Sequence, residues 1–245
     1  MADVMGVQSV VRTFALLELL CENGEMGITE LSVKSGYSKS TVFRLINTLV
    51  DLGYVKKNNL TSGYAVTLKF LKISAFERTL YDQRNEMRPI LEKLSEECGE
   101  TVHLVERSGK DIIYIDKIEN NSNSFRMASR IGMSLPMVYT ASGKTIMSYL
   151  TEAEIKKIWD QSNIIAKTPH TITDFMEFSK EINDVRNSGI AIDNEENELG
   201  VCCLAKAFSD IDGVYNYAVS VSVPKVRLDD EKIRHIKELL KKCKI

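Results

Sequence analysis

The first third of the chain repeats apolar residues with the period of an α-helix in three separate stretches. Residues 7–20 carry apolar side chains every three or four positions, and residues 29–35 form a shorter run of the same kind. Residues 38–52 place Val42, Leu45, Ile46, Leu49 and Leu52 on one stripe. Because residues three and four apart share one face of a helix, this spacing predicts three amphipathic helices.

Capping and turn residues mark the ends of these helices. Thr29 is expected to cap the start of the second helix and Gly36 to end it. Ser38 is expected to cap the third helix, and Gly53 to stop it. The run "YVKKNNLTSGYAVT" at 54–67 then predicts two short strands around a turn rich in Asn and Gly. Helix, helix, turn, helix and hairpin is the element order of a winged helix-turn-helix.

A polar helical stretch joins this part to the rest of the chain. Residues 68–95 keep a helical pattern, but Pro89 lies within it, and proline is tolerated in the first turn of a helix rather than inside. We therefore expect a connecting helix, a break, and a new helix that Pro89 begins. The predicted division is a DNA-binding domain over 1–70, a linker helix over 71–88 and a second domain over 89–245.

The second domain alternates strand-like and helix-like segments. Thr151 and Glu154 have the spacing of a capping box, and Gly189 is placed to end a helix. The predicted strands are 101–106, 111–118, 124–129, 190–193, 200–208 and 216–224, and the predicted helices are 139–150, 151–160, 174–189 and 228–243. This pattern predicts an α+β fold with one antiparallel or mixed sheet and helices packed on it.

Composition and cysteine usage narrow the class of protein. The chain is 44% hydrophobic and 27% charged, which is ordinary for a soluble globular protein. It contains no apolar run of membrane-spanning length, and its N-terminus lacks the pattern of a signal peptide, so we expect a cytoplasmic protein without a membrane partner. Its five cysteines show no paired spacing. We therefore expect reduced thiols, no metal site and no cofactor.

The third predicted helix has donor-rich polar residues near its start. In a helix-turn-helix, the second helix of the motif enters the major groove with its N-terminal residues at the base edges. Arginine can bond guanine with two donors, and serine or threonine can bond a base or a phosphate. Lysines on the first strand of the wing can reach phosphates, which position the protein. The residues predicted to contact DNA are Ser38, Lys39, Ser40, Thr41, Arg44, Asn47, Lys56 and Lys57.

The alternative for this face is a solvated helix in a small interaction domain. Charge alone does not separate the two interpretations, since the net charge is −2 and residues 1–75 hold eight basic against six acidic residues. The order of the elements favours the DNA interface.

Five segments resemble a known family. Residues 28–55, "ITELSVKSGYSKSTVFRLINTLVDLGYV", resemble the helix-turn-helix signature of the IclR family of bacterial transcriptional regulators. The resemblance continues in order at "GETVHLVERSGKDIIYIDKIE", "ASGKTIMSYL", "GIAIDNEENELGVCCLAKAF" and "AVSVSVP". It implies a winged helix-turn-helix, a linker helix and a GAF-like effector-binding domain. It also implies homodimers, or tetramers built of dimers, on operator DNA, where two recognition helices read half-sites roughly 34 Å apart or a multiple of that.

Four segments are candidates for an effector pocket. Small residues before the helix at 139–150 let an anion approach free backbone N–H groups, and two hydroxyls on one face of the strand at 216–224 need polar partners. By resemblance, Asp193 and Cys203 face the pocket. The alternatives are a tight turn, an exposed sheet face, a solvated acidic loop and a small buried thiol. The residues predicted to line the pocket are Met133, Leu135, Ala141, Ser142, Asp193, Cys203, Ser220 and Ser222.

The predicted function is a ligand-responsive DNA-binding regulator, a repressor of a catabolic operon. The expected effector is a small anionic metabolite such as a keto or sugar acid. "SGKT" at 142–145 resembles the end of a phosphate-binding loop but lacks the upstream glycines, so ATP is not expected. One alternative is a thiol-based redox sensor using Cys202 or Cys203. Another is an enzyme using Cys203 with His103, but no acid–base signature joins them, so no catalysis is expected.

Overall fold

The computed structural model describes residues 6–74, 78–120, 127–210 and 212–243 of the 245-residue chain. The chain divides into two compact units, residues 1–78 and residues 79–245. Across the described ranges, every helix is too short or too polar to serve as a membrane span. Each unit has its own hydrophobic core, so each is described by itself.

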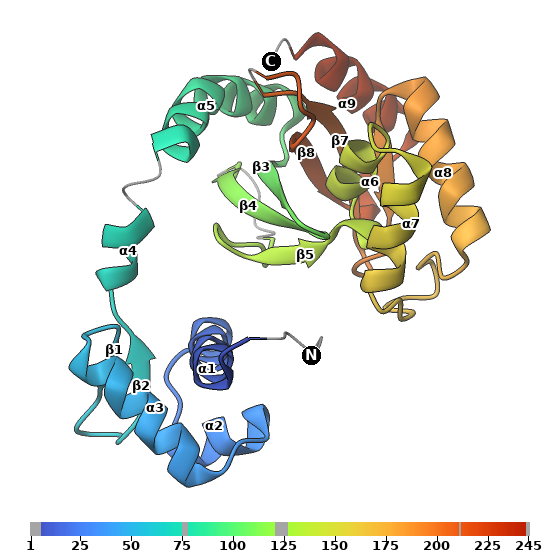
Figure 1. Ribbon diagram of the computed structural model, residues 1–245. Coiled ribbons are helices and arrows are strands. Elements are labelled where there is room, and N and C mark those ends of the chain that lie inside the picture. The colour runs from blue at the N-terminus through green and yellow to red at the C-terminus, as the bar shows by residue number, and fades with distance from the viewer. Residues whose placement is uncertain (1–5, 75–77, 121–126, 211, 244–245) are drawn as a thin grey trace. The chain divides into compact units, whose positions relative to one another are not determined.

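The first unit is a winged helix-turn-helix, as predicted (Figure 1). Its elements are α1 (Gln8–Asn23), α2 (Ile28–Ser35), α3 (Lys39–Asp51), β1 (Val55–Lys57), β2 (Tyr64–Val66) and α4 (Lys69–Ser74). The two strands pair in antiparallel register and form the wing. The predicted stripe of α3 is confirmed at the four positions Val42, Leu45, Ile46 and Leu49, which are buried in the core with α1 and α2. Leu52 instead lies at the end of the helix and is 53% exposed.

The predicted start of α2 was wrong by two residues. Gly27, not Thr29, is the N-cap, and Thr29 lies inside the helix. The reason is tertiary, because the backbone of Met26 bonds that of Tyr64 in the wing at 3.0 and 2.9 Å. This pairing fixes the chain immediately before Gly27, and the helix starts there without a side-chain cap.

The break expected at Pro89 is also absent. Helix α5 (Arg78–Cys98) contains Pro89 in its interior. Met87 before the proline and Leu91 after it are buried in the same hydrophobic cluster, and this packing keeps the two turns in line despite the missing N–H. The predicted linker at 71–88 covers the end of α4, the start of α5 and residues 75–77, which lie outside the described residues.

A six-stranded antiparallel sheet with the order β5-β4-β3-β8-β7-β6 forms the centre of the second unit. The strands are β3 (Thr101–Ser108), β4 (Asp111–Ile118), β5 (Ser134–Pro136), β6 (Ala191–Asn194), β7 (Val201–Phe208) and β8 (Tyr217–Pro224). Of the strand predicted at 124–129, residues 124–126 lie outside the described residues, and residues 127–129 are not in a strand. The short edge strand β5 was not predicted.

Helices cover both faces of this sheet (Figure 1). Helices α5 and α9 (Asp230–Lys242) pack on one face, and α6 (Ala141–Met147), α7 (Glu152–Gln161) and α8 (Phe175–Ser188) lie on the other. The predicted capping box of Thr151 and Glu154 is present at the start of α7. On β8, Val219, Val221 and Val223 join the α5–α9 core, which leaves the alternate residues for the α6 face.

Candidate functional site

A cavity of about 80 Å³ lies on the α6 face of the sheet, where residues of all six strands and of the segment after β6 line it. All eight residues predicted for the effector pocket line it, namely Met133, Leu135, Ala141, Ser142, Asp193, Cys203, Ser220 and Ser222. The structure therefore brings together residues that are up to 89 positions apart in the chain. Their role in holding an effector stays a prediction.

Strand register explains why these side chains meet. Asp193 of β6 lies opposite Cys203 of β7, and Cys203 lies opposite Ser222 of β8. Ser220, two residues away on the same face, lies opposite His103 of β3. Because directly paired residues point to the same side of a sheet, four strands present one continuous polar wall to the cavity.

Hydrogen bonds connect part of this wall. Cys203 Sγ and Ser222 Oγ are hydrogen-bonded at 3.2 Å, Ser222 Oγ lies 3.4 Å from His103 Nδ1, and His103 Nε2 lies 2.7 Å from Ser129 Oγ. Burial, with the nearby charge of Lys117, lowers the pKa of His103 to about 3. His103 is therefore neutral at physiological pH, and it orients its neighbours rather than acting as a base.

The cysteines of β7 do not support the catalytic or redox alternatives. Burial raises the pKa of the Cys203 thiol, and the nearby Asp193 carboxyl raises it further. Burial likewise raises the pKa of Cys202. The thiolate is the reactive form of cysteine, so both thiols lie in surroundings that suppress their reactivity.

Asp193 is the most deeply buried acidic residue on the cavity wall, with 3% of its surface exposed. Its Oδ1 accepts the backbone N–H of Glu196 at 2.7 Å. Burial raises the pKa of Asp193 to about 7, and the charge of the neighbouring Glu196 carboxyl is the second cause of this increase. Near neutral pH the residue is thus divided between its charged and neutral forms.

Lys144 of α6 lies close behind the wall and is fully engaged by protein groups. Its Nζ donates to the carbonyl oxygen of Ile192 at 3.0 Å, to Glu181 Oε1 at 3.4 Å and to Glu196 Oε1. The side chain is completely buried. A lysine held in this way is unavailable to a phosphate, which agrees with the absence of a complete phosphate-binding motif in the sequence.

The small residues at the start of α6 serve packing. A Cβ atom on Gly143 would lie 2.1 Å from the carbonyl oxygen of Met137, so only glycine lets α6 approach the preceding turn. The side chain of Thr140 accepts the Gly143 N–H at 3.0 Å, which removes one of the free donors expected for an anion.

Several lining residues were missed by sequence reasoning. His103 was considered only as a catalytic base, although its neighbours Val102 and Leu104 are core residues and strand alternation places it on the cavity face. Residues in loops do not alternate between two faces as strand residues do, so this pattern could not identify them. The other lining residues not identified are Tyr114, Met127, Ala128, Ser129, Thr140, Asn197, Glu198 and Val201.

Three hydroxyl groups on the cavity wall have no hydrogen-bond partner among the described residues. They belong to Tyr114, Ser142 and Ser220. Ser142 and Ser220 are only 3% and 4% exposed. Because these residues line the cavity and their hydroxyls bond no described group, they are available to a ligand that carries polar atoms.

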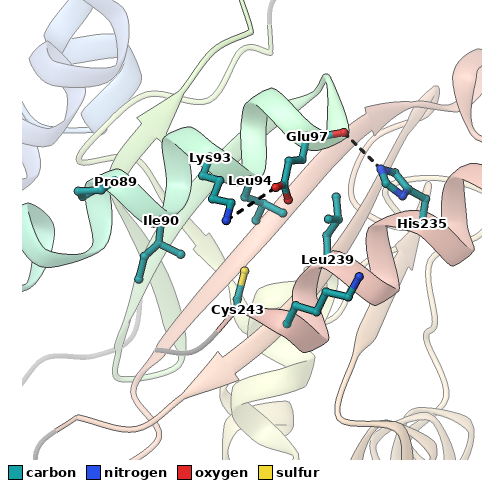
Figure 2. A pocket seen from close by; sticks show the side chains of 9 residues that line it. Pro89, Ile90, Lys93, Leu94, Glu97, His235, Leu239 and Cys243 are labelled. Atoms are coloured by element: carbon teal, nitrogen blue, oxygen red, sulfur yellow. Dashed lines mark hydrogen bonds and ion pairs between the residues drawn. The ribbon is translucent and has the colours of Figure 1, made fainter.

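A larger hollow of about 640 Å³ lies between α5 and α9, on the opposite face of the sheet (Figure 2). Its polar groups bond one another, since Lys93 Nζ lies 3.9 Å from Glu97 Oε1 and His235 Nε2 lies 3.2 Å from the carbonyl oxygen of Glu97 (Figure 2). None of the predicted site residues lines this hollow between α5 and α9.

The predicted DNA-contacting residues gather at the start of α3 and on β1. Ser38 Oγ accepts the Thr41 N–H at 3.3 Å, which confirms the predicted cap, and it lies 3.0 Å from Ser40 Oγ. Lys39 and Arg44 are exposed, and neither side chain bonds another described residue. Asn47 is half-buried. The open face of α3 therefore offers two free cations beside a group of hydroxyls.

The wing carries two further exposed lysines, Lys56 and Lys57. Lys57 Nζ lies 5.9 Å from the ring centroid of Tyr64 on the paired strand. Glu25, which was not predicted, holds the tip of the wing by accepting Asn58 Nδ2 at 3.0 Å and the Thr61 hydroxyl. That these residues contact DNA remains a prediction.

Comparisons with known proteins agree with both units. The family described as "Bacterial transcriptional regulator IclR C-terminal" matches residues 79–244, and the "IclR helix-turn-helix domain" matches residues 9–59. The chain is 35% identical to the HTH-type transcriptional regulator KdgR of Escherichia coli, over 96% of this chain and 89% of that protein. It is 30% identical to the Escherichia coli transcriptional repressor IclR, over 93% and 84% respectively. The crystal structure of Thermotoga maritima IclR superposes with a TM-score of 0.71 at 30% identity, covering 96% of this chain and 94% of that one.

Proposed function

The chain belongs to the IclR family of bacterial transcriptional regulators, and we propose that it is a repressor that binds operator DNA as a homodimer and is released by a small organic acid. The observation that carries the proposal is the cavity of the second unit. Polar side chains of five strands and the short helix α6 line it, and three of its hydroxyls lack a partner among the described residues.

Repression is supported by the description of one relative, the Escherichia coli repressor IclR. The effector changes operator affinity only through a difference in its own affinity for the DNA-bound and free states of the regulator. The acid must therefore bind the free dimer more tightly than the dimer on its operator.

The first experiment is a thermal-shift screen against keto, hydroxy and sugar acids. A saturable rise in melting temperature identifies a ligand, because selective binding to the native state stabilises it by mass action. The active compound is then added to the protein on its operator, where it is expected to lower the affinity for DNA. A compound that stabilises the protein and leaves the operator affinity unchanged would rule out its role as the effector.

Ser220→Ala is expected to weaken binding of the acid found in the screen by about 0.5–1.5 kcal/mol, the net contribution of one hydrogen bond. The fold should be unaffected, since the hydroxyl bonds no described residue and the substitution is small. Isothermal titration calorimetry measures the change. Ser108→Ala, an equal substitution at an exposed position of β3 outside the cavity, should bind like the wild type. Equal affinity of the Ser220 variant would place the ligand elsewhere.

Lys57→Ala is expected to weaken binding to all DNA sequences alike and to reduce the slope of log K against log salt by about 1, because a lysine on the wing contacts phosphate. Binding to operator and scrambled duplexes is measured between low and moderate salt. Lys156→Ala, which removes an exposed lysine from α7, serves as the control. An unchanged salt slope for the Lys57 variant would exclude this phosphate contact.

The homodimer is supported by an apolar stripe on α1. Val10 and Phe14 on α1 are 51% and 58% exposed and lie four residues apart on one face, and Val7, the N-cap residue before them, is 68% exposed. A second copy of α1 in an isologous interface would cover this face.

Val10→Ala is therefore expected to raise the dimer dissociation constant about tenfold to a hundredfold, since it removes two methyl groups from each copy. Analytical ultracentrifugation measures the constant, and Met176→Ala on α8, 75% exposed in the wild type, is the control. An unchanged dimer would move the interface away from α1.

A further inference from the structure

The tip of the wing is held by an acidic residue that lies outside the wing. Glu25 is in the connection between α1 and α2, and its carboxylate accepts hydrogen bonds from two residues of the turn between β1 and β2. Asn58 Nδ2 donates to Oε2 at 3.0 Å and approaches Oε1 at 3.3 Å, and the Thr61 hydroxyl donates to Oε1. Hydrogen bonds to a charged acceptor are stronger than those between neutral groups, so this contact joins two distant parts of the unit firmly.

Asn58 and Thr61 in turn fix the backbone of the tip. Asn58 Oδ1 accepts the Leu60 N–H at 3.0 Å, and Thr61 Oγ1 accepts the Gly63 N–H at 3.2 Å. The backbone closes the same turn, because the Asn58 N–H donates to the Gly63 carbonyl oxygen at 2.8 Å. Each side chain that bonds Glu25 therefore also bonds a backbone group, and the place of the carboxylate sets the place of the whole tip.

The fit around Glu25 depends on a glycine. A Cβ atom on Gly63 would lie 2.5 Å from both Cγ and Oε1 of Glu25, so a larger residue would displace the carboxylate. The base of the wing is joined to the same connection by the backbone pairing of Met26 with Tyr64. Helices α1, α2 and α3 share one core, so two separate contacts fix the wing relative to α3.

The charge of Glu25 would by itself oppose DNA binding. Hydrogen bonds from Thr61 and Asn58 lower the pKa of this exposed carboxyl, and the charge of Lys56 lowers it further. The residue is therefore ionised at neutral pH, close to a lysine that is predicted to contact phosphate. A negative charge beside a phosphate contact weakens binding unless the residue contributes in another way.

We propose that Glu25 is a positioning residue for DNA binding, which fixes the tip of the wing and thereby places Lys56 and Lys57 against the phosphate backbone. The two lysines directly precede Asn58 on β1, and β1 is paired with β2, so a displacement of the tip moves them. Without the contact to Glu25, the wing would have to be ordered when DNA binds, and this entropic cost would lower the affinity. The inference rests on the proposed function, in which both lysines contact phosphate.

The test is binding of the full-length protein to a short duplex of random sequence, followed by fluorescence anisotropy over a range of salt concentrations. A random sequence suffices, because phosphate contacts are independent of sequence. Glu25→Ala is expected to weaken binding and to reduce the slope of log K against log salt by about 1–2, since each lost phosphate contact accounts for about 0.9. Repulsion by the carboxylate alone would give the opposite result, tighter binding after the negative charge is removed.

Gly63→Ala breaks the same contact but leaves the negative charge in the protein, since the new methyl group displaces the Glu25 carboxylate. Alanine is compatible with the backbone there, because Gly63 lies outside the left-handed region. This variant should lose affinity and slope as Glu25→Ala does. Glu30→Ala, which removes another exposed carboxylate of the first unit, is the matched control and should bind at least as tightly as the wild type.

Hydrogen exchange followed by mass spectrometry separates a loosened wing from an unfolded domain. Residues 54–67 should exchange faster in the Glu25 and Gly63 variants, whereas α3 should exchange as it does in the wild type. Faster exchange of α3 as well would mean that Glu25 stabilises the whole unit, which would overturn the positioning role.

A double-mutant cycle distinguishes positioning of the lysines from an effect on other contacts. In a protein that already carries Lys56→Ala and Lys57→Ala, Glu25→Ala should cause no further loss of salt slope, although it should still accelerate exchange of the wing. An additional loss of slope in that background would contradict the inference, because Glu25 would then act on phosphate contacts elsewhere.

Failure of the inference and failure of the proposed function give different results. If Lys56→Ala combined with Lys57→Ala leaves the salt slope unchanged, the wing does not contact phosphate, and that part of the proposed function is wrong. If the two lysine substitutions reduce the slope but Glu25→Ala leaves binding unchanged or tightens it, the inference alone is wrong, and Glu25 serves only the stability of the turn.

Discussion

Arg44→Ala is expected to weaken operator binding by about 1–3 kcal/mol at each half-site and to relax the preference at one base step. Arg44 is exposed on α3, one and a half turns after the Ser38 cap, where helix-turn-helix proteins approach the base edges. Because a homodimer presents the residue twice, the loss over the complete operator is about 2–6 kcal/mol, or roughly thirtyfold to twenty-thousandfold in affinity.

Fluorescence anisotropy with operator and scrambled duplexes at one salt concentration measures this loss. Arg44→Lys keeps the charge but cannot form the two-pronged bond to guanine, so it should lose most of the specificity and retain non-specific affinity. Arg107→Ala, in β3 of the second unit, is the control. An equal loss on both duplexes would assign Arg44 to a phosphate, and no loss on either would exclude α3 as the recognition helix.

The elements that the sequence predicted correctly depend on local signals. The stripe of α3, the Ser38 cap and the Thr151–Glu154 capping box are each set by residues within a few positions of one another. Two of the errors arise where distant contacts prevail. The start of α2 follows from the pairing of Met26 with Tyr64, and the continuity of α5 through Pro89 follows from burial on both sides of the proline. Neither contact is visible in the local sequence.

The candidate pocket was predictable to the extent that strand alternation and the family resemblance marked its residues. Ser220 and Ser222 were found because they alternate with core valines on β8. Tyr114 and Ser129 were not, since they reach the wall through the pairing of β4 with β3 and through an irregular segment. The state of charge of the wall could not be predicted either, because the sequence does not reveal that Lys144 is committed to Glu181 and Glu196.

Lys144 connects the stability of the second unit to the shape of the cavity. It joins α6 to α8 through Glu181, and to the segment after β6 through Glu196. The backbone N–H of Glu196 bonds Asp193, which lines the cavity. Loss of the lysine would therefore leave two carboxylates without a cation and loosen the segment that positions Asp193.

Lys144→Met is expected to lower the free energy of unfolding of the second unit by about 3–5 kcal/mol, the usual cost of removing one partner from a buried ion pair. Burial raises the pKa of Glu196 and Lys144 lowers it, so the variant's Glu196 should have a still higher pKa. A carboxyl whose pKa is raised in the folded state destabilises the fold as pH rises through that pKa. The loss of unfolding free energy in the variant should therefore be largest at neutral pH and shrink toward pH 4. Urea unfolding at several pH values measures this loss.

The control variant is Lys156→Met, which breaks the exposed pair with Asp160 on α7 and should cost no more than about 0.5 kcal/mol. Adding Glu196→Gln should restore part of the stability lost in the Lys144 variant, because it removes the buried charge. A deficit that is independent of pH and unaffected by Glu196→Gln would mean that Lys144 stabilises the unit through packing of its aliphatic chain rather than through its charge.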